Sequence, residues 1–193
     1  PRRSVVTIYD ARFLRYPETY QRARHAFLRT AVPWSLRRAG HIITISEFTK
    51  RELVELLGLP PEKISVTLLA PRAEFVRVED EARLAQVRAR YGLPARFVLS
   101  TSTLEPRKNL SRAVEAFAEL RRRGVPHSLV LAGVRHFGTS DLEQAITRHG
   151  MRDSVRVLGY VDDTDMASLY TLAEAFIYPS LYEGFGIPPL EAM

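Results

Sequence analysis

The part of the chain after residue 95 alternates between short apolar runs and longer segments with a helical period. Four apolar runs are short enough to be buried strands, and each is followed by a segment whose apolar residues recur every three or four positions. Strands that alternate with helices predict a parallel sheet whose two faces are covered by helices. We expect strands at 96–101, 127–132, 155–158 and 175–178, and helices at 80–91, 109–123, 141–149, 163–173 and from 188 onward.

The first 70 residues contain a shorter form of this pattern. A long helical stretch follows the first apolar run, and Pro33 is expected to kink or divide it. Ser46 can cap a further helix, because a serine oxygen accepts hydrogen bonds from the first-turn N–H groups, and Gly58 is a suitable end for it. We expect strands at 5–9, 41–45 and 64–68, and helices at 17–39 and 47–57.

Residues 70–78 lack clear periodicity and contain Pro71, so we predict a domain boundary in this segment. The predicted domains are 1–75 and 76–193. Ligand sites of open parallel sheets lie past the carboxyl ends of the strands. In the second domain the loops at that edge are 102–109, 133–140, 159–163 and 180–186.

Cysteine is absent from the 193 residues, which excludes disulfides, thiol catalysis and thiolate metal sites. No stretch approaches the length of a membrane span, and no secretory signal precedes the first apolar run. These features favour a cytoplasmic location. Peripheral attachment to the inner face of a membrane is an open alternative.

The positive charge is concentrated near the N-terminus. Residues 1–72 carry a net charge of +7 and residues 73–193 a net charge of −1, which gives the overall +6. A basic segment of this kind attracts phosphates or an anionic membrane surface. A solvated basic helix face is an equally good interpretation. Nucleic acid is a poor fit as a partner, because the candidate ligand residues cluster in the nearly neutral part of the chain after residue 72.

The segment 105–109, Glu-Pro-Arg-Lys-Asn, follows an expected strand and precedes an expected helix. The positive end of a helix dipole, the free N–H groups and the side chains of Arg107 and Lys108 would favour the same anion, such as a diphosphate. Solvated charges near a helix start are the plainer interpretation of this segment alone.

Glu183 and Glu191 stand on either side of a Gly-x-Gly turn, and the following helix starts at proline. Glycines allow the backbone to approach phosphate, and carboxylates accept hydrogen bonds from sugar hydroxyls. This pattern favours an anionic, hydroxyl-rich ligand. A metal site is not expected: Asp163 is more simply a helix cap, and the histidines, among them His136 in a loop, show no ligand spacing.

The run Pro-Ser-x-x-Glu-Gly-Phe-Gly, with seven residues between Glu183 and Glu191, resembles the signature of the retaining glycosyltransferases of family four. Relatives of this kind include mannosyltransferases. Other segments also resemble that family: 103–109 its donor-phosphate loop, 129–133 its next strand and turn, 157–161 its nucleobase segment, and 45–50 the last part of its acceptor domain.

This resemblance implies a GT-B fold with two Rossmann-like parallel-sheet domains. The N-terminal domain is expected to be incomplete and the C-terminal domain to lack its end, so that the segment alone is expected to be poorly active. The resemblance also implies a metal-independent mechanism that retains the anomeric configuration.

The resemblance assigns roles by position. Glu183 is expected near the hydroxyls of the transferred sugar, and Glu191 at the nucleotide ribose. Lys108 and Arg107 are expected to hold the diphosphate. The remaining donor-side positions are Gly184, Phe185 and Gly186 as N–H donors, Thr103 in the phosphate loop, and Tyr160 and Val161 around the base.

Two positions depart from the family pattern. Thr103 stands where many relatives have an arginine. Tyr9 and Asp10 stand where many have a His-Asp pair on the sugar side, and tyrosine is a poor base near neutral pH.

The function expected is transfer of a sugar, such as mannose, from GDP-mannose or a UDP-sugar to a saccharide or lipid-linked acceptor, in polysaccharide or glycolipid synthesis. The alternative is a non-catalytic module that binds a nucleotide sugar. A basic nucleic-acid-binding protein is the third and least favoured hypothesis.

Overall fold

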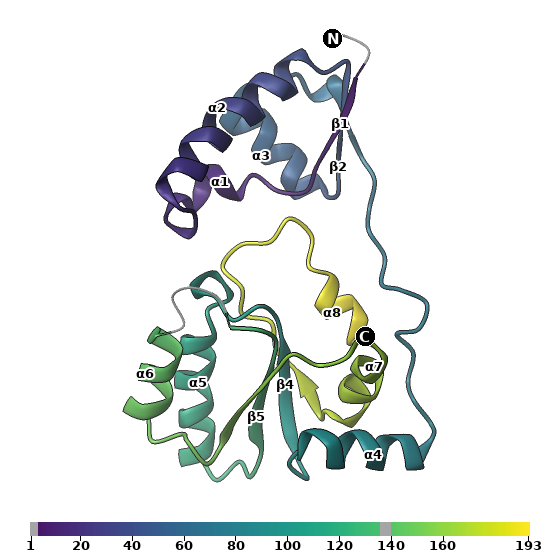
Figure 1. The fold of residues 1–193 in the computed structure, drawn as a ribbon, viewed down its shortest axis with the longest axis vertical. Coiled ribbons are helices and arrows are strands. Elements are labelled where there is room, and N and C mark those ends of the chain that lie inside the picture. The colour runs from purple at the N-terminus through teal and green to yellow at the C-terminus, as the bar shows by residue number, and fades with distance from the viewer. Residues whose placement is uncertain (1–3, 136–139) are drawn as a thin grey trace. The chain divides into compact units, whose positions relative to one another are not determined.

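The computed structural model describes residues 4–135 and 140–193, so His136 and the middle of the loop 133–140 lie outside the described residues (Figure 1). The chain forms two compact units. Unit 1 is the chain up to Ala70 together with Tyr182–Gly186, and unit 2 is Pro71–Leu181 together with Ile187–Met193. These units differ from the predicted domains at residues 71–75 and, more importantly, at 182–186, because the second difference places Glu183 in unit 1.

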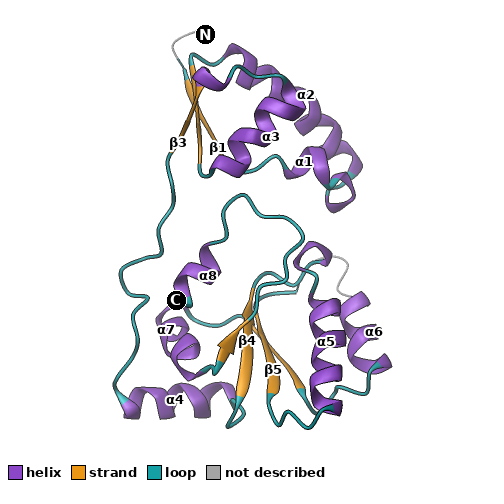
Figure 2. Cartoon of the chain, turned by 180° about the vertical axis from the view of Figure 1, so that it is seen from behind, coloured by secondary structure: helices purple, strands orange, loops and turns teal. Residues whose placement is uncertain are grey.

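Unit 1 contains a parallel three-stranded sheet in the order β1-β2-β3 (Figure 2). Its core is made by apolar residues of the strands and of the longer helices, such as Leu36, Ile42 and Leu53, which are fully buried. The strands are β1 (Val5–Ile8), β2 (His41–Thr44) and β3 (Ile64–Val66), and the helices are α1 (Arg12–Arg15), α2 (Arg22–Arg38) and α3 (Glu47–Leu57).

The ends of α3 confirm the sequence prediction. The Ser46 hydroxyl oxygen accepts a hydrogen bond from the Thr49 N–H at 3.0 Å, and Gly58 ends the helix in the left-handed conformation. The predicted division of α2 at Pro33 is wrong, because one helix runs through it. Pro33 and Leu36 are buried, and this burial offsets the backbone hydrogen bond that the proline cannot donate.

Unit 2 contains a parallel four-stranded sheet in the order β6-β5-β4-β7. This arrangement confirms the predicted α/β fold. Its strands are β4 (Phe97–Thr101), β5 (Ser128–Ala132), β6 (Val155–Gly159) and β7 (Ala175–Phe176). Its helices are α4 (Glu81–Tyr91), α5 (Leu110–Arg122), α6 (Ser140–Arg148), α7 (Asp163–Leu172) and α8 (Ile187–Glu191).

Helices cover both faces of this sheet, as Figures 1 and 2 show. Alternate residues of a strand point to opposite faces. Leu129 and Leu131 of β5 accordingly pack in the core under α5 and α6, whereas Val130 packs in the core under α4 and α7. The central strands are therefore apolar on both sides, which explains why their sequences are nearly continuous hydrophobic runs.

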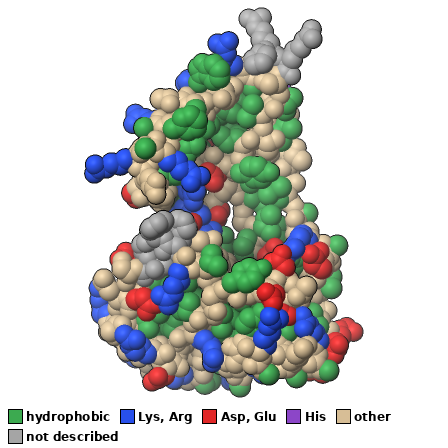
Figure 3. Space-filling view, viewed as in Figure 1, with side chains coloured by type: hydrophobic (Ala, Val, Ile, Leu, Met, Phe, Trp, Pro, Cys, Tyr) green, Lys and Arg blue, Asp and Glu red, His purple; other side chains and the backbone are tan. Residues whose placement is uncertain are grey.

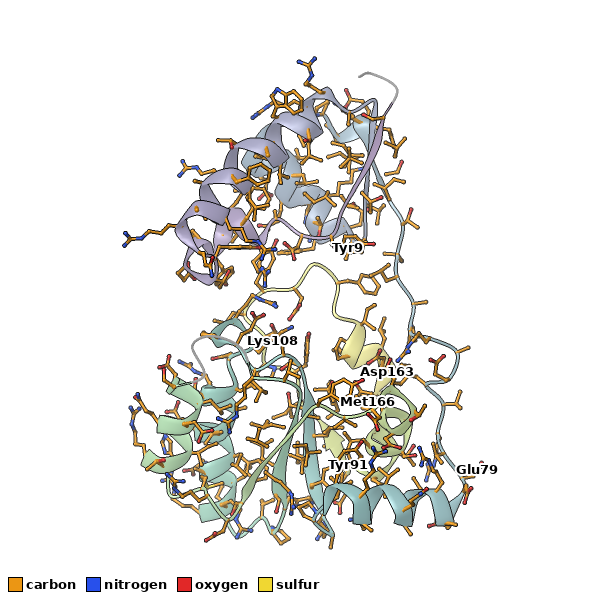
Figure 4. All side chains as sticks on the ribbon, viewed as in Figure 1. Tyr9, Glu79, Tyr91, Lys108, Asp163 and Met166 are labelled. Atoms are coloured by element: carbon orange, nitrogen blue, oxygen red, sulfur yellow. The ribbon has the colours of Figure 1, made fainter. Side chains whose placement is uncertain are left out.

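A buried carboxylate joins α4 to α7. Asp165 is fully buried and accepts hydrogen bonds from Arg83, from Arg90 at 2.8 Å and from the Tyr91 hydroxyl at 2.8 Å. Tyr91 is labelled in Figure 4 at the end of α4. Burial raises the pKa of Tyr91, so its hydroxyl remains a donor at neutral pH.

The prediction that Asp163 caps α7 is wrong. The helix begins at Asp163, the cap position is occupied by Asp162, and the Asp162 side chain makes no capping hydrogen bond. The reason is that Asp162 instead pairs with Arg90, as part of the same group of charges around Asp165.

Candidate functional site

The strand order of unit 2 reverses at β4. The chain proceeds from β4 to β5 and β6 on one side, and then returns to place β7 on the other side of β4. Open α/β sheets bind ligands outside the carboxyl ends of their strands at such a reversal. The topology therefore points to the edge where β4 and β5 end.

A cleft of about 230 Å³ lies at this edge. Three of the residues predicted from the sequence line it together: Tyr160, Val161 and Glu191. Tyr160 is largely exposed, whereas Val161 is buried. The complete lining is Thr101, Ser102, Ala132, Gly133, Tyr160, Val161, Met166, Tyr170, Pro188 and Glu191.

Glu191 ends α8 and is held by a short hydrogen-bonded relay. The Tyr170 hydroxyl donates to the Glu191 carboxylate at 2.9 Å. The Thr101 hydroxyl lies 2.8 Å from the Tyr170 oxygen, and it must be the donor there because the Tyr170 proton is already used. Only one oxygen of the Glu191 carboxylate is engaged in this way, and within the described residues the other accepts no hydrogen bond. That oxygen can accept a ligand hydroxyl.

Burial is the main cause that raises the pKa of Tyr170 well above its usual range. The phenol is therefore protonated at neutral pH and acts as a donor to Glu191. Its ring is packed edge-on against Phe75 and Phe176, with centroid distances of 5.8 and 5.5 Å. These contacts fix the position of the hydroxyl under the cleft.

Lys108 lies in the loop after β4, at the same edge of the sheet (Figure 4). Its side chain is only 8% exposed. The ammonium nitrogen donates to the Tyr178 hydroxyl at 3.0 Å and lies 5.1 Å from the centre of the Tyr178 ring. The face of an aromatic ring attracts a cation, so the Tyr178 ring and hydroxyl both help to hold the Lys108 ammonium group in place.

Arg107 is equally buried, but a carboxylate is close to it. Its guanidinium pairs with Glu105 at 2.5 Å. The positive charge of Arg107, which the sequence analysis assigned to binding an anion, is therefore partly balanced by Glu105 within the same loop.

The loops after β4 and β7 are joined along their length. The Arg107 carbonyl accepts a hydrogen bond from the Leu181 N–H at 2.9 Å, and the Asn109 amide donates to the Pro179 carbonyl at 3.2 Å. Asn109 has a left-handed backbone, with φ of 57°. These contacts join the loop 102–109 to residues 178–181. Thr103, earlier in the first loop, is exposed.

The remaining predicted residues lie in unit 1. Tyr9 is 60% exposed, and the Asp10 carboxylate accepts a hydrogen bond from the Arg12 N–H at 2.9 Å, which fixes the start of α1. The Tyr9 backbone and the Asp10 Cβ atom lie directly against Gly184. A Cβ atom added at Gly184 would lie 2.1 Å from the Tyr9 carbonyl oxygen, so only glycine fits at this position.

The turn after Glu183 presents backbone donors. Gly186 has φ of 102°, a conformation that favours glycine. In the described part of the chain, no group accepts a hydrogen bond from the N–H of Gly184, Phe185 or Gly186. Successive N–H groups of this kind suit an anion, and the binding of an anion here stays a prediction.

Sequence reasoning missed Thr101, Met166 and Tyr170. Thr101 ends a strand, and the other two lie on α7, where polar and apolar residues mix without a clear stripe. No local signal separates these residues from ordinary core positions.

Among the described residues no cluster of three or more His, Asp or Glu side chains could hold a metal ion. None of the described helices has the length and apolar character to cross a membrane.

Comparison with known protein families gives two matches. The family model for glycosyl transferases group 1 matches residues 87–193, and the model for glycosyltransferase family 4 matches residues 1–68. The first match covers more than half of the chain.

Individual proteins are similar over nearly the whole chain. An O-antigen chain mannosyltransferase B of Escherichia coli is 34% identical over 99% of this chain and 50% of the relative. An alpha-D-kanosaminyltransferase of Streptomyces kanamyceticus is 32% identical over 98% of this chain and 50% of the relative. The crystal structure of Anabaena Alr3699/HepE in complex with UDP-glucose is 25% identical, with a TM-score of 0.76 over 99% of this chain and 51% of that chain. The chain thus spans about half the length of these relatives.

Proposed function

Because the chain belongs to the glycosyl transferases group 1 family, we propose that its full-length protein transfers a sugar from a nucleotide-diphosphate sugar to an acceptor with retention of configuration. The observation that carries this proposal is the cleft at the strand-order reversal of unit 2. In that cleft the Thr101–Tyr170 relay orients the Glu191 carboxylate, and the buried cation Lys108 lies in a loop at the same edge of the sheet.

In this proposal the groups of the cleft bind the nucleotide. Tyr160 and Val161 contact the base, and the uncommitted oxygen of Glu191 accepts a hydrogen bond from a ribose hydroxyl. A hydrogen bond to a charged acceptor is worth about 1.5–3 kcal/mol. Lys108 binds the diphosphate, with Arg107 and Thr103 of the same loop in a supporting role.

The reaction breaks the bond between the anomeric carbon and the diphosphate oxygen and forms a bond from that carbon to the acceptor oxygen. The acceptor proton passes to the departing phosphate, so no enzyme nucleophile is required. Negative charge grows on the diphosphate as it leaves, and a preorganised cation such as Lys108 stabilises that charge. Neither the transfer of the sugar nor the transfer of the proton uses a metal ion in this proposal.

Unit 1 supplies the other proposed contacts. Glu183 is assigned to the hydroxyls of the transferred sugar, and the N–H groups of Gly184, Phe185 and Gly186 to an anionic group of the donor. Tyr9 and Asp10, which lie against Gly184, are the sugar-side candidates. The exposed Tyr9 phenol can donate a hydrogen bond there, in place of an imidazole.

The chemical identities of the donor and the acceptor are proposed only from the proteins to which this chain is similar. The mannosyltransferase likeness favours mannose carried by GDP, and the likeness to a structure that holds UDP-glucose makes a UDP-sugar the alternative. A saccharide or a lipid-linked saccharide of polysaccharide synthesis is the proposed acceptor. A module that binds the nucleotide sugar without turning it over is the second candidate, and the departure at Tyr9 is the observation that favours it.

A panel of nucleotide sugars tests whether the protein binds a nucleotide sugar, as the proposal requires. We expect GDP-mannose or a UDP-sugar to raise the unfolding midpoint of the full-length protein, because a ligand stabilises the state that binds it. Glu191→Gln should weaken binding of that ligand about tenfold, since the ribose hydroxyl loses a charged acceptor. Calorimetry measures both affinities.

The matched control is Glu115→Gln, which changes an exposed glutamate of α5 in the same unit. The affinity of Glu115→Gln for the nucleotide sugar should equal that of the unaltered protein. Equal affinities for all three proteins would contradict the role of Glu191. Tight binding without any release of nucleoside diphosphate, over several acceptors, would support the non-catalytic module.

An anionic membrane surface is the proposed site of action, on the cytoplasmic side. Phe27 and Trp34 are 66% and 60% exposed on α2. They are seven residues apart, which is two helical turns, so they share one face of the helix. The Arg38 guanidinium lies 5.0 Å from the Trp34 ring centre, and Figure 3 shows basic and hydrophobic side chains side by side over this part of unit 1. Exposed aromatics among arginines are typical of helices that lie in a membrane interface.

The double variant Phe27→Ala/Trp34→Ala should reduce binding to vesicles that contain anionic lipid by at least about tenfold, because partial burial of each ring is worth about 1 kcal/mol. Co-sedimentation with the vesicles measures this. Leu68→Ala, which removes an equally exposed apolar side chain of unit 1, is the control and should bind normally. Identical sedimentation with neutral and anionic vesicles would contradict the membrane proposal.

A further inference from the structure

One polar face of α3 holds the segment 182–186. Ser46, Thr49 and Glu52 are spaced three residues apart, at the start and in the first turns of the helix, and so lie on one side of it. All three are buried, with exposures of 9%, 0% and 4%. Buried polar groups need partners, and the partners of this face include Tyr182 and Gly184.

Tyr182 is fixed at three points. Its hydroxyl donates to the Glu52 carboxylate at 2.5 Å and accepts a hydrogen bond from the Ala11 N–H at 3.0 Å. Its ring lies 5.5 Å from the rings of both Tyr16 and Phe48. The side chain is only 6% exposed. Such a residue has no freedom to change its rotamer without breaking contacts with α1, α3 and the turn between β1 and α1.

The charge of Glu52 is balanced on its other side. The Arg15 guanidinium donates to the Glu52 carboxylate at 2.7 Å. Burial, followed by the contact with Glu52, raises the pKa of Tyr182 well above its usual range. The phenol therefore stays protonated at neutral pH and acts as a donor to Glu52.

Gly184 is fixed by its carbonyl oxygen and by its lack of a side chain. The hydroxyls of Ser46 and Thr49 both lie within hydrogen-bonding distance of the Gly184 carbonyl. The Tyr9 carbonyl oxygen occupies the space of a side chain at Gly184. Glu183 thus stands between two residues whose positions are both determined by the interior of unit 1.

We infer that Tyr182 and Glu52 are positioning residues that set the place of Glu183 for the transferred sugar; this inference rests on the proposed function of Glu183. Neither residue touches the substrate. A shift of about 1 Å in a substrate-positioning group can lower turnover by up to about a hundredfold. Loss of the Tyr182 hydroxyl should therefore lower kcat while leaving nucleotide binding, which is assigned to unit 2, unaltered.

Tyr182→Phe in the full-length protein is the decisive change, because it removes the hydroxyl and keeps the ring contacts with Tyr16 and Phe48. Tyr91→Phe is the matched control: it also removes a hydroxyl that donates to a buried carboxylate, but in unit 2 and outside the proposed site. The substrate is GDP-mannose, or UDP-glucose if the nucleotide panel selects uridine. Release of nucleoside diphosphate gives kcat and KM, and calorimetry with GDP or UDP gives the nucleotide Kd.

We expect Tyr182→Phe to lower kcat about tenfold with KM and the nucleotide Kd within about twofold of the unaltered protein. Glu52→Ala, which removes the acceptor oxygens, should do the same, and the double variant should lose little more than either single one, because both changes remove the hydrogen bond between Tyr182 and Glu52. Tyr91→Phe should keep its kcat within about twofold.

If the unaltered protein is active and both Tyr182→Phe and Glu52→Ala have the same kcat as Tyr91→Phe, the inference is overturned and the proposed function remains intact. An unaltered protein that turns over no nucleotide sugar would instead overturn the proposed function and, with it, the inference.

Discussion

Replacing Lys108 with alanine in the full-length protein is expected to lower kcat by about 100- to 1,000-fold. Removal of one preorganised donor to a developing anion costs about 2.7–4 kcal/mol of transition-state stabilisation. Lys108 is buried, and the Tyr178 hydroxyl and ring hold its ammonium group, so the cation is preorganised in its loop. Steady-state release of nucleoside diphosphate from the donor measures the effect.

Lys63→Ala is the control for this prediction. Lys63 also places its ammonium group against protein acceptors, the carbonyls of Leu36 and Arg37 at 3.0 and 2.9 Å, but it lies in unit 1 and outside the proposed site. The kcat of Lys63→Ala should remain within about threefold of the kcat of the unaltered protein. Lys108→Arg should recover part of the activity, because it restores the charge without the same geometry. A Lys108→Ala protein that is folded and fully active would contradict the assignment of Lys108 to the diphosphate.

Asp165→Asn is expected to destabilise unit 2 by about 3 kcal/mol. Removing one partner of a buried ion pair costs about 3–5 kcal/mol, and the lower end applies because Arg83 and Arg90 can still reach water. Urea unfolding followed by circular dichroism measures the loss in the free energy of unfolding. Hydrogen exchange localises it: the amides of α4 and α7 should exchange faster, and those of α3 should not.

Asp163→Asn is the matched control, two residues away on the same helix. The Asp163 carboxylate is 69% exposed and pairs with a half-exposed Arg72 at 3.2 Å. Exposed pairs of this kind contribute about 0–1 kcal/mol. Equal stability losses for the two variants would show that the group around Asp165 does not join α4 to α7.

The secondary structure was largely predictable because its signals are local. Ser46 caps α3 through a hydrogen bond to a residue three positions away, and Gly58 and Gly92 end their helices in the left-handed conformation. The two-sided burial of β4 and β5 produces apolar runs that can be read directly from the sequence. Pro33 misled the prediction, because its cost to α2 is offset by burial that the local sequence does not reveal.

The assignment of 182–186 to unit 1 was not predictable in the same way. It depends on Tyr182 and Glu52, which are 130 residues apart in the chain. The glutamates of the motif were evident in the sequence, but the residues that orient them were not. Tyr170, which binds Glu191, and Glu52, which binds Tyr182, look like ordinary helix positions until the fold brings them to their partners.

The basic segment near the N-terminus has two equal interpretations from the sequence, and the membrane interpretation stays a prediction. Charge alone fits either a solvated helix or an anionic surface. The structure adds that α2 exposes two large rings, those of Phe27 and Trp34, on one face beside its arginines. The membrane proposal therefore rests on the aromatic residues rather than on net charge.

The most direct test of the account is the anomeric configuration of a transfer product. The full-length protein is incubated with GDP-mannose or UDP-glucose, a simple alkyl glycoside acceptor and a metal chelator, and proton NMR of the isolated product identifies the new linkage. The account predicts release of nucleoside diphosphate and a product with the same anomeric configuration as the donor. A product of inverted configuration, or no transfer from any nucleotide sugar to any acceptor, would contradict it.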